Sequence, residues 1–246
     1  MTDAVCYSQT EIEQKFLLDA VSARQLERHP LLVREHPVVR PTFSTYFDTA
    51  GHDLRRHHSS LRLRKDGDRI AQTYKQRISQ SGGLFVRRQF ETEIVDGGPH
   101  LASIRPYLPY ELRDMPETAL APIFRSDIKR SEWHLSWESS IISVVIDEGR
   151  IICGADSEIV CELETELVDG AVSTLFTLAA ALGENILFHP LTESKADKGY
   201  RLAAMRGATL GSCSPGDTAM PILPVQMQWP DKKKLSGFKF RGEYIP

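Results

Sequence analysis

Acidic residues separated by a single position occur in two distant parts of this 246-residue chain. Glu11 and Glu13 form the first pair, and Glu162, Glu164 and Glu166 form a later run of three. Side chains two positions apart in an extended strand point to the same face, so each group would present its carboxylates together. Carboxylates are hard oxygen ligands for Mg²⁺ or Mn²⁺. The spacing therefore indicates divalent-metal chemistry.

Basic residues follow the same spacing and are concentrated in one part of the chain. Arg62 and Arg64 form one pair, and Lys75 and Arg77 form another. Residues 54–90 contain ten Lys or Arg residues against two acids. Arg and Lys bind phosphate oxygens through charge-assisted hydrogen bonds, and divalent metals neutralise phosphate charge. Together the two groups favour binding of a compact polyanion and its hydrolysis by in-line attack of water.

Alternation of apolar and charged residues predicts that strands carry most of these side chains. Turn-forming sequences separate the alternating runs at 65–68 (KDGD), 80–83 (QSGG) and 147–150 (DEGR). The expected strands cover residues 9–18, 38–48, 60–65, 69–79, 84–95, 121–135, 140–148 and 158–168. The expected helices cover residues 19–28, 50–58, 98–105, 169–184 and 195–206. The domain is therefore expected to be mainly strand, with a few covering helices.

Each expected strand has one charged and one apolar face. In the strand at 121–135, Arg125, Asp127 and Lys129 share the charged face, and Phe124 and Ile128 share the apolar face. Charged faces that simply point to water are the ordinary alternative. We favour a barrel whose apolar side faces out towards helices, because the charges repeat as pairs while the apolar face is complete. Charges in the lumen of such a barrel must be paired or bind ions, since isolated burial costs several kcal/mol each.

The order of these charged strands resembles that of the CYTH superfamily, the triphosphate tunnel metalloenzymes. Residues 11–16 (EIEQKF) match the E-x-E-x-K signature of that family, and eight further blocks follow in its order. The blocks are TYFDT (45–49), LRLR (61–64), TYKQR (73–77), RRQFETEI (87–94), IFRSDIKRSEW (123–133), VVIDEGRI (144–151), CELETEL (161–167) and SKADKGYR (194–201). The resemblance implies an α+β fold: an eight-stranded antiparallel β-barrel with a charged lumen and outer helices. It also implies that the tunnel binds a triphosphate together with Mg²⁺ or Mn²⁺.

The resemblance assigns roles to individual residues. Lys15, Glu11 and Glu13 are the expected catalytic residues. The expected metal ligands are acidic: Glu11, Glu13, Glu91, Glu93, Asp147, Glu162 and Glu164. The expected substrate-binding residues are basic: Arg40, Arg62, Arg64, Lys75, Arg87, Arg125, Lys129, Arg130 and Lys195. Two assignments stay open, because Arg40 also suits an exposed strand edge, and a bulge would exchange Lys129 for Arg130 at the basic position.

Several activities are compatible with such a tunnel, because all of them require a triphosphate and a metal. The YFDT block resembles that of bacterial inorganic triphosphatases, so we predict hydrolysis of tripolyphosphate to pyrophosphate and phosphate. Thiamine triphosphatase, RNA 5′-triphosphatase and class IV-type adenylyl cyclase are alternatives. Cyclases commonly have an H-F lead into the signature, where this chain has YSQT, and we find no adenine-reading motif. A non-enzymatic polyphosphate-binding module is disfavoured, because binding alone would not need the acidic pairs.

Composition and charge indicate which partners and which cellular location to expect. A net charge of −3 disfavours a nucleic-acid binder. No apolar run approaches the ~20 residues of a membrane helix, and the first residues lack the pattern of a secretory signal. Four scattered cysteines without a CxxC pair predict free thiols. We expect a cytoplasmic protein that binds a triphosphate-containing small molecule, without nucleic-acid or membrane partners, and homodimer formation is left open.

Two regions are expected along the chain. Residues 1–206 form the tunnel domain, and residues 207–246 form a proline-rich tail that is extended or partly docked. Bacterial inorganic triphosphatases often carry a helical CHAD domain after the tunnel. The roughly 40 residues that follow position 206 are too few for a helical domain of that kind, so none is expected here.

Overall fold

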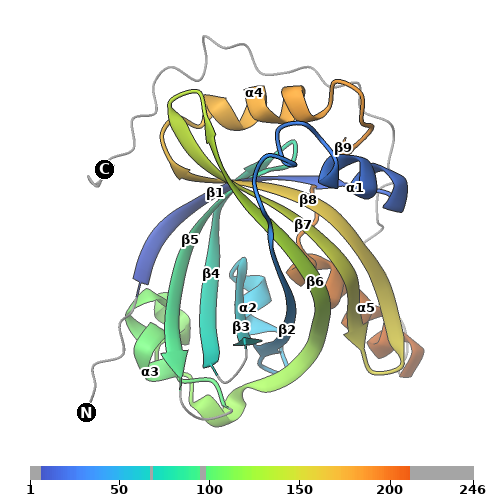
Figure 1. The fold of residues 1–246 in the computed structure, drawn as a ribbon. Coiled ribbons are helices and arrows are strands. Elements are labelled where there is room, and N and C mark those ends of the chain that lie inside the picture. The colour runs from blue at the N-terminus through green and yellow to red at the C-terminus, as the bar shows by residue number, and fades with distance from the viewer. Residues whose placement is uncertain (1–6, 67–68, 95–97, 211–246) are drawn as a thin grey trace.

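The computed structural model describes residues 7–66, 69–94 and 98–210, and its centre is a closed barrel of eight antiparallel strands (Figure 1). The strands are β1 (Tyr7–Leu17), β2 (Val38–Asp48), β3 (Ser59–Asp66), β4 (Arg69–Ser81), β5 (Leu84–Ile94), β6 (Ala121–Trp137), β7 (Ser140–Cys153) and β8 (Asp156–Asp169). Around the barrel they follow the order β5-β4-β3-β2-β6-β7-β8-β1, and β1 also pairs with β5, which closes the barrel. The expected eight-stranded antiparallel barrel is confirmed.

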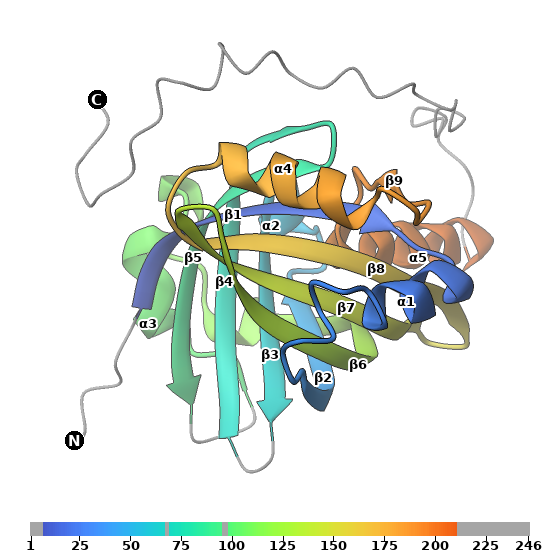
Figure 2. The ribbon, with the colours of Figure 1, turned by 45° about the horizontal axis from the view of Figure 1, so that its top comes forward.

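Short helices surround this barrel. The α-helices are α1 (Ala20–Glu27), α2 (Asp53–Arg56), α3 (Leu101–Ile104), α4 (Ser173–Leu182) and α5 (Lys195–Leu210), and the 3₁₀ turns are η1 (Arg105–Tyr107), η2 (Tyr110–Leu112) and η3 (Glu117–Ala119). A two-residue strand, β9 (His189–Pro190), pairs with the end of β1. Figure 2 shows α4 lying across β1 and β8, with α1 beside the ends of β7 and β8. Within the described residues, no helix combines the length and the apolar character needed to cross a membrane.

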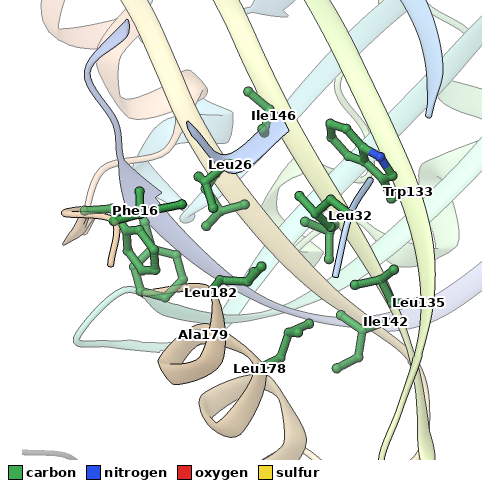
Figure 3. Close-up of a cluster of buried hydrophobic side chains, with 14 of the residues drawn as sticks. Phe16, Leu26, Leu32, Trp133, Leu135, Ile142, Ile146, Leu178, Ala179 and Leu182 are labelled. Atoms are coloured by element: carbon green, nitrogen blue, oxygen red, sulfur yellow. The ribbon is translucent and has the colours of Figure 1, made fainter. Parts of the chain in front are cut away.

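The largest apolar core lies between the barrel and the helices α1 and α4. Leu178 and Leu182 of α4 are fully buried in it, together with Leu26 of α1. Figure 3 shows these helical side chains directed towards the strands, where Phe16 and Ile142 belong to the same cluster. The side chains that alternate with these on the strands point into the barrel, because successive strand residues face opposite ways. Packing of the apolar face on helices therefore turns the charged face inward.

A smaller core joins α5 to β6, β7 and β8. It contains Phe124 and Ile128 of β6, Ile151 of β7 and Tyr200 of α5. By strand alternation, Phe124 and Ile128 share a face of β6 with Arg130, which lines the tunnel. The helix thus covers a strand face that, further along, becomes the tunnel wall.

One expected turn is a strand. Residues 147–150 continue β7, which ends at Cys153 and turns into β8 around Gly154. Gly149 lies opposite Ile128, and a Cβ at this position would lie 2.1 Å from the Asp127 carbonyl oxygen. The glycine permits a close approach of two backbones rather than a change of direction.

The domain boundary remains a prediction. Helix α5 continues beyond residue 206 to Leu210, so the expected end of the tunnel domain falls inside a helix. Residues 211–246, which form most of the expected tail, lie outside the described part of the chain.

Candidate active site

The lumen of the barrel forms a cavity of about 570 Å³ with a strongly charged lining. Strands β1 to β6 and β8 contribute to it, as do α2 and α5. Of the expected catalytic and substrate-binding residues, ten line the cavity: Glu11, Glu13, Lys15, Arg40, Arg62, Arg64, Lys75, Arg87, Arg130 and Lys195. Side chains that are far apart in the sequence therefore meet in one site.

Basic residues of β3 form one wall of the cavity. Arg62 and Arg64 alternate on β3 and point inward, opposite the outward-facing Leu61 and Leu63. Arg62 and burial together lower the pKa of Arg64 to about 10. Among the described residues, Arg62 has no carboxylate within ion-pair distance, and Arg64 has only Glu91 at 3.7 Å. This concentration of unneutralised positive charge is suited to bind an anion.

Arg40 also lines the cavity and is not a free strand-edge residue. It lies on β2, and its guanidinium donates to the Glu132 carboxylate at 2.6 Å. Its side chain remains one-third exposed, so it is placed towards an opening of the cavity.

Three carboxylates gather on β1 and β8. One oxygen each from Glu11, Glu13 and Glu166 lies within 4.8 Å of the others. The β1–β8 register produces this cluster, because it places Glu13 directly opposite Glu166. Lys75 and Arg87 bind Glu11, and Arg87 also contacts Glu13 at 2.7 Å.

Within this cluster the pKa values of Glu11 and Glu166 are shifted in opposite directions. Burial would raise the pKa of Glu11, but Lys75 and Arg87 together lower it to about 2. Burial and the nearby Glu11 raise the pKa of Glu166 to about 7. Within the described residues Glu166 has no ion-pair partner, whereas Glu13 Oε1 lies near Arg87 and Lys15 but in hydrogen-bonding geometry with neither. Three converging carboxylate oxygens, with Glu166 left without a cation, fit a hard divalent cation.

The second acidic group is neutralised by the protein itself. Asp147, Glu162 and Glu164 lie on β7 and β8, and the first two are 0% exposed. The Lys195 ammonium lies 2.7 to 2.9 Å from all three carboxylates. Lys198 adds a contact to Glu162 at 2.8 Å. These acids were expected as metal ligands, but in the structure they hold lysines, because buried carboxylates require nearby positive charge.

Lys15 connects the two acidic groups. Its ammonium bonds to Glu164 and lies 3.3 Å from Glu13. Burial would lower the pKa of Lys15, but Glu13 and Glu164 raise it, so the side chain is a cation. Its backbone pairs with Glu164 across the β1–β8 ladder. The signature lysine is thus held at the boundary between the carboxylate cluster and the neutralised acids.

Helix α5 brings Lys195 and Lys198 to these acids. The sequence S-x-x-D begins the helix: the Asp197 amide donates to Ser194 Oγ, and the Ser194 amide donates to the Asp197 carboxylate. This reciprocal cap sets Lys195 at the first helical position. Lys198 follows three residues later on the same face, and its side chain is buried, contrary to the solvated position of an ordinary surface helix.

Arg125 and Lys129 do not line the tunnel, so their expected place on its wall is wrong. Their side chains are 61% and 54% exposed and pair with acids on the outer surface. The neighbouring Arg130 lines the cavity, and its guanidinium binds Asp147 through two hydrogen bonds of 2.8 and 2.6 Å. The face was misassigned because Phe124 and Ile128 are apolar yet point inward, where α5 covers them.

Glu91 and Glu93, the expected acidic pair on β5, lie in different surroundings. Glu91 lines the cavity, where it accepts a hydrogen bond from the Thr73 hydroxyl at 3.0 Å. Glu93 is exposed and pairs with Arg69 near the end of β5. Glu166, which joins Glu11 and Glu13 in the carboxylate cluster, was not among the expected ligands, although it continues the alternation of Glu162 and Glu164.

Comparison with known proteins agrees with this architecture. The CYTH domain family matches residues 9–200, and the chain belongs to this family. Over 167 residues the chain is 30% identical to an inorganic triphosphatase of Haemophilus influenzae. That match covers 68% of this chain and 47% of the other, so the chain spans about half the length of this curated relative.

Two solved structures share the fold. A Hippeastrum protein, an adenylyl cyclase candidate with a dominant triphosphatase activity, superposes with a TM-score of 0.57 at 22% identity, covering 78% of this chain and 95% of that one. An adenylate cyclase candidate from Bacillus halodurans has a TM-score of 0.52 at 20% identity, covering 78% and 97%. At these identities the likeness concerns the fold.

Proposed function

We propose that the protein hydrolyses inorganic tripolyphosphate to pyrophosphate and phosphate inside the tunnel, with Mg²⁺ or Mn²⁺ as cofactor. The observation that carries this proposal is a carboxylate cluster and a basic wall facing one cavity. The cluster contains Glu11, Glu13 and Glu166, and the wall is centred on Arg62 and Arg64. The inorganic triphosphatase relative supports the same reaction class.

The chain's own residues account for binding and orientation. Arg62, Arg64 and Lys75 would bind phosphate oxygens, and Arg guanidinium groups suit this role because they donate in pairs. A divalent ion held by the carboxylate cluster would supply charge neutralisation at the phosphates. Lys15 carries a fixed positive charge beside the cluster and would stabilise negative charge on the terminal phosphate.

The cavity lining favours an inorganic substrate over a nucleotide or thiamine triphosphate. Two aromatic side chains, Tyr46 and Tyr200, line it. Tyr46 already stacks on Phe124 at 4.5 Å, and Tyr200 packs edge-on against the same ring and donates to Asp48 at 2.7 Å. Because both rings already pack against other side chains, the described lining presents arginines and carboxylates rather than a free aromatic surface on which a nucleobase or thiamine ring could stack.

One assay separates the candidate activities. Purified protein receives tripolyphosphate, thiamine triphosphate or ATP, with Mg²⁺ or Mn²⁺, and phosphate, pyrophosphate and cyclic AMP are measured. We expect the highest kcat/KM with tripolyphosphate, and complete loss of turnover in excess EDTA with an unchanged circular dichroism spectrum. Cyclic AMP as the main product from ATP would replace this proposal with the cyclase alternative. Turnover that persists in EDTA would exclude the metal-dependent mechanism.

The proposed substrate is a small molecule, so no nucleic-acid partner is required. A cytoplasmic location remains a prediction from the sequence, and homodimer formation remains open.

A further inference from the structure

The hairpin between β4 and β5 touches the backbone of Lys15. Its two-residue turn consists of Gly82 and Gly83, whose φ angles are +55° and +86°. The Lys15 amide donates to the Gly83 carbonyl at 2.9 Å, and the Leu191 amide donates to the Lys15 carbonyl at 2.8 Å. At Lys15, therefore, this side of β1 changes its hydrogen-bonding partner from the β5 hairpin to the segment that follows β9.

The two glycines of the turn differ in their surroundings. A Cβ at Gly83 would lie 3.0 Å from the Lys15 carbonyl oxygen and 3.1 Å from Pro190 Cβ. A Cβ at Gly82 would have no heavy atom within 4 Å. Both positions need the positive φ that glycine adopts without strain. Only Gly83 must also be small so that the hairpin can approach Lys15 and β9.

The same hairpin contacts the other end of the lysine. Phe85 points inward from β5 and is fully buried. The Lys15 ammonium lies 5.9 Å from the centre of its ring, and the Arg87 guanidinium carbon lies 4.6 Å from it. Both distances are within the range of cation–π attraction. Residues 83–85 thus hold Lys15 at its backbone and at its charged group.

We propose that the Gly83–Phe85 segment is a positioning element that sets the Lys15 ammonium between Glu13 and Glu164. The inference rests on the proposed function, in which Lys15 acts at the phosphate. A lysine side chain has four rotatable bonds, so its charged end is placed accurately only if its backbone and its tip are both fixed. Misplacement by about 1 Å can lower a rate on the order of 100-fold.

The test compares Gly83→Ala with Gly82→Ala, which introduces the same side chain at a positive φ without the contact. We expect kcat for tripolyphosphate to fall at least tenfold in Gly83→Ala with KM changed less than threefold, and both constants to stay within twofold of wild type in Gly82→Ala. Phe85→Leu should lower kcat in the same direction. Equal losses of kcat in the two glycine variants would overturn the proposal.

Amide hydrogen exchange tests the contact without turnover. The Lys15 and Leu191 amides should exchange at least tenfold faster in Gly83→Ala and at the wild-type rate in Gly82→Ala. Unchanged exchange in Gly83→Ala, or faster exchange with unchanged kcat, would overturn the positioning role. If Gly83→Ala does not fold, Phe85→Leu decides, and an unchanged kcat there overturns the proposal. A wild-type protein that does not hydrolyse tripolyphosphate would refute the proposed function. The exchange rates would still test whether Gly83 fixes the backbone of Lys15.

Discussion

Asp147 keeps its charge in a fully buried position because cations reach it from two elements. Arg130 of β6 donates two hydrogen bonds to it, and Lys195 of α5 lies 2.7 Å away. Burial would raise the pKa of Asp147, but Lys195 and Arg130 together lower it. Removing one partner of a buried pair leaves an uncompensated charge, whereas an exposed pair contributes little.

Adjacent residues on β6 provide a matched test of this difference. Arg130→Met should lower the free energy of unfolding by about 3–5 kcal/mol, because it removes one of the two cations that balance the buried Asp147 carboxylate. Lys129→Met, one position earlier and exposed, should change it by less than about 0.5 kcal/mol. Urea unfolding followed by circular dichroism measures both. Similar losses in the two variants would contradict the assignment of Arg130 to the tunnel and Lys129 to the outer surface.

In the proposed metal site, Glu166 should make binding depend on pH. Its pKa is raised to about 7 in the metal-free protein, and a cation binds the ionised carboxylate, so below pH 7 binding must release a proton. The apparent affinity for Mg²⁺ should therefore increase as the pH rises from 5.5 and level off above 7. Glu166→Gln should weaken binding and flatten the profile. Isothermal titration calorimetry between pH 5.5 and 8.5 measures both, and a flat wild-type profile would contradict the prediction.

At the scale of elements, β3 supplies the basic wall of the cavity, where among the described residues Arg62 has no carboxylate within ion-pair distance. Arg62→Ala should raise KM for tripolyphosphate by about tenfold or more, from the loss of about 1.5–3 kcal/mol per charged hydrogen bond. Thermal stability should stay the same or increase, because Arg62 and Arg64 repel each other in the empty lumen. Steady-state kinetics and thermal melts test both parts. An unchanged KM would show that phosphate does not contact β3.

The strands and their inward faces were largely predictable where alternation was regular. On β1 and β3, the charged positions Glu11, Lys15 and Arg62 all line the tunnel as expected. Alternation gave the wrong inward face on β6. There α5 packs on apolar residues of the inward face, so an apolar residue does not mark the outer face of this strand. Only the packing of α5, a contact distant in sequence, distinguishes Lys129 from Arg130.

Ligand assignment within the acidic strands was also limited by distant contacts. The E-x-E spacing pointed to β8, which contributes Glu166 to the carboxylate cluster. Whether Glu162 or Glu166 is left without a cation depends on which lysines reach it. Lys195 and Lys198 arrive from α5, more than 30 positions later. Spacing within one strand does not show which of its carboxylates will be bound by a lysine from α5.

For the whole molecule, the buried carboxylates predict loss of stability in acid. Nearby cations lower the pKa of Glu11 to about 2 and also lower those of Asp147, Glu162 and Glu164, in each case against the effect of burial. Unfolded carboxyl groups titrate near pH 4, so the unfolded chain takes up protons first as the pH falls. This stabilisation should be complete above about pH 5 and should decrease from pH 4 towards pH 2.

Urea midpoints at pH 7, 5, 4 and 3 measure this effect. Glu166 acts in the opposite direction, because its raised pKa favours the folded state as the pH falls from 7 to about 4.5. The midpoint should therefore rise between pH 7 and 5, through Glu166, and fall steeply below 4. A midpoint that stays constant from pH 5 to pH 3 would contradict the conclusion that these buried carboxylates are ionised and paired with cations.

The place of β1 between β5 and β8 has a consequence for biosynthesis. Glu13 is synthesised 153 positions before its neighbour Glu166 on β8. At about 5–20 residues per second, β1 waits roughly 8–30 s for its second partner. During that time its apolar residues Ile12 and Phe16 are available to chaperones. A translation product that stops before β8 has neither a closed barrel nor the three-carboxylate cluster, so both form only in chains synthesised past this strand.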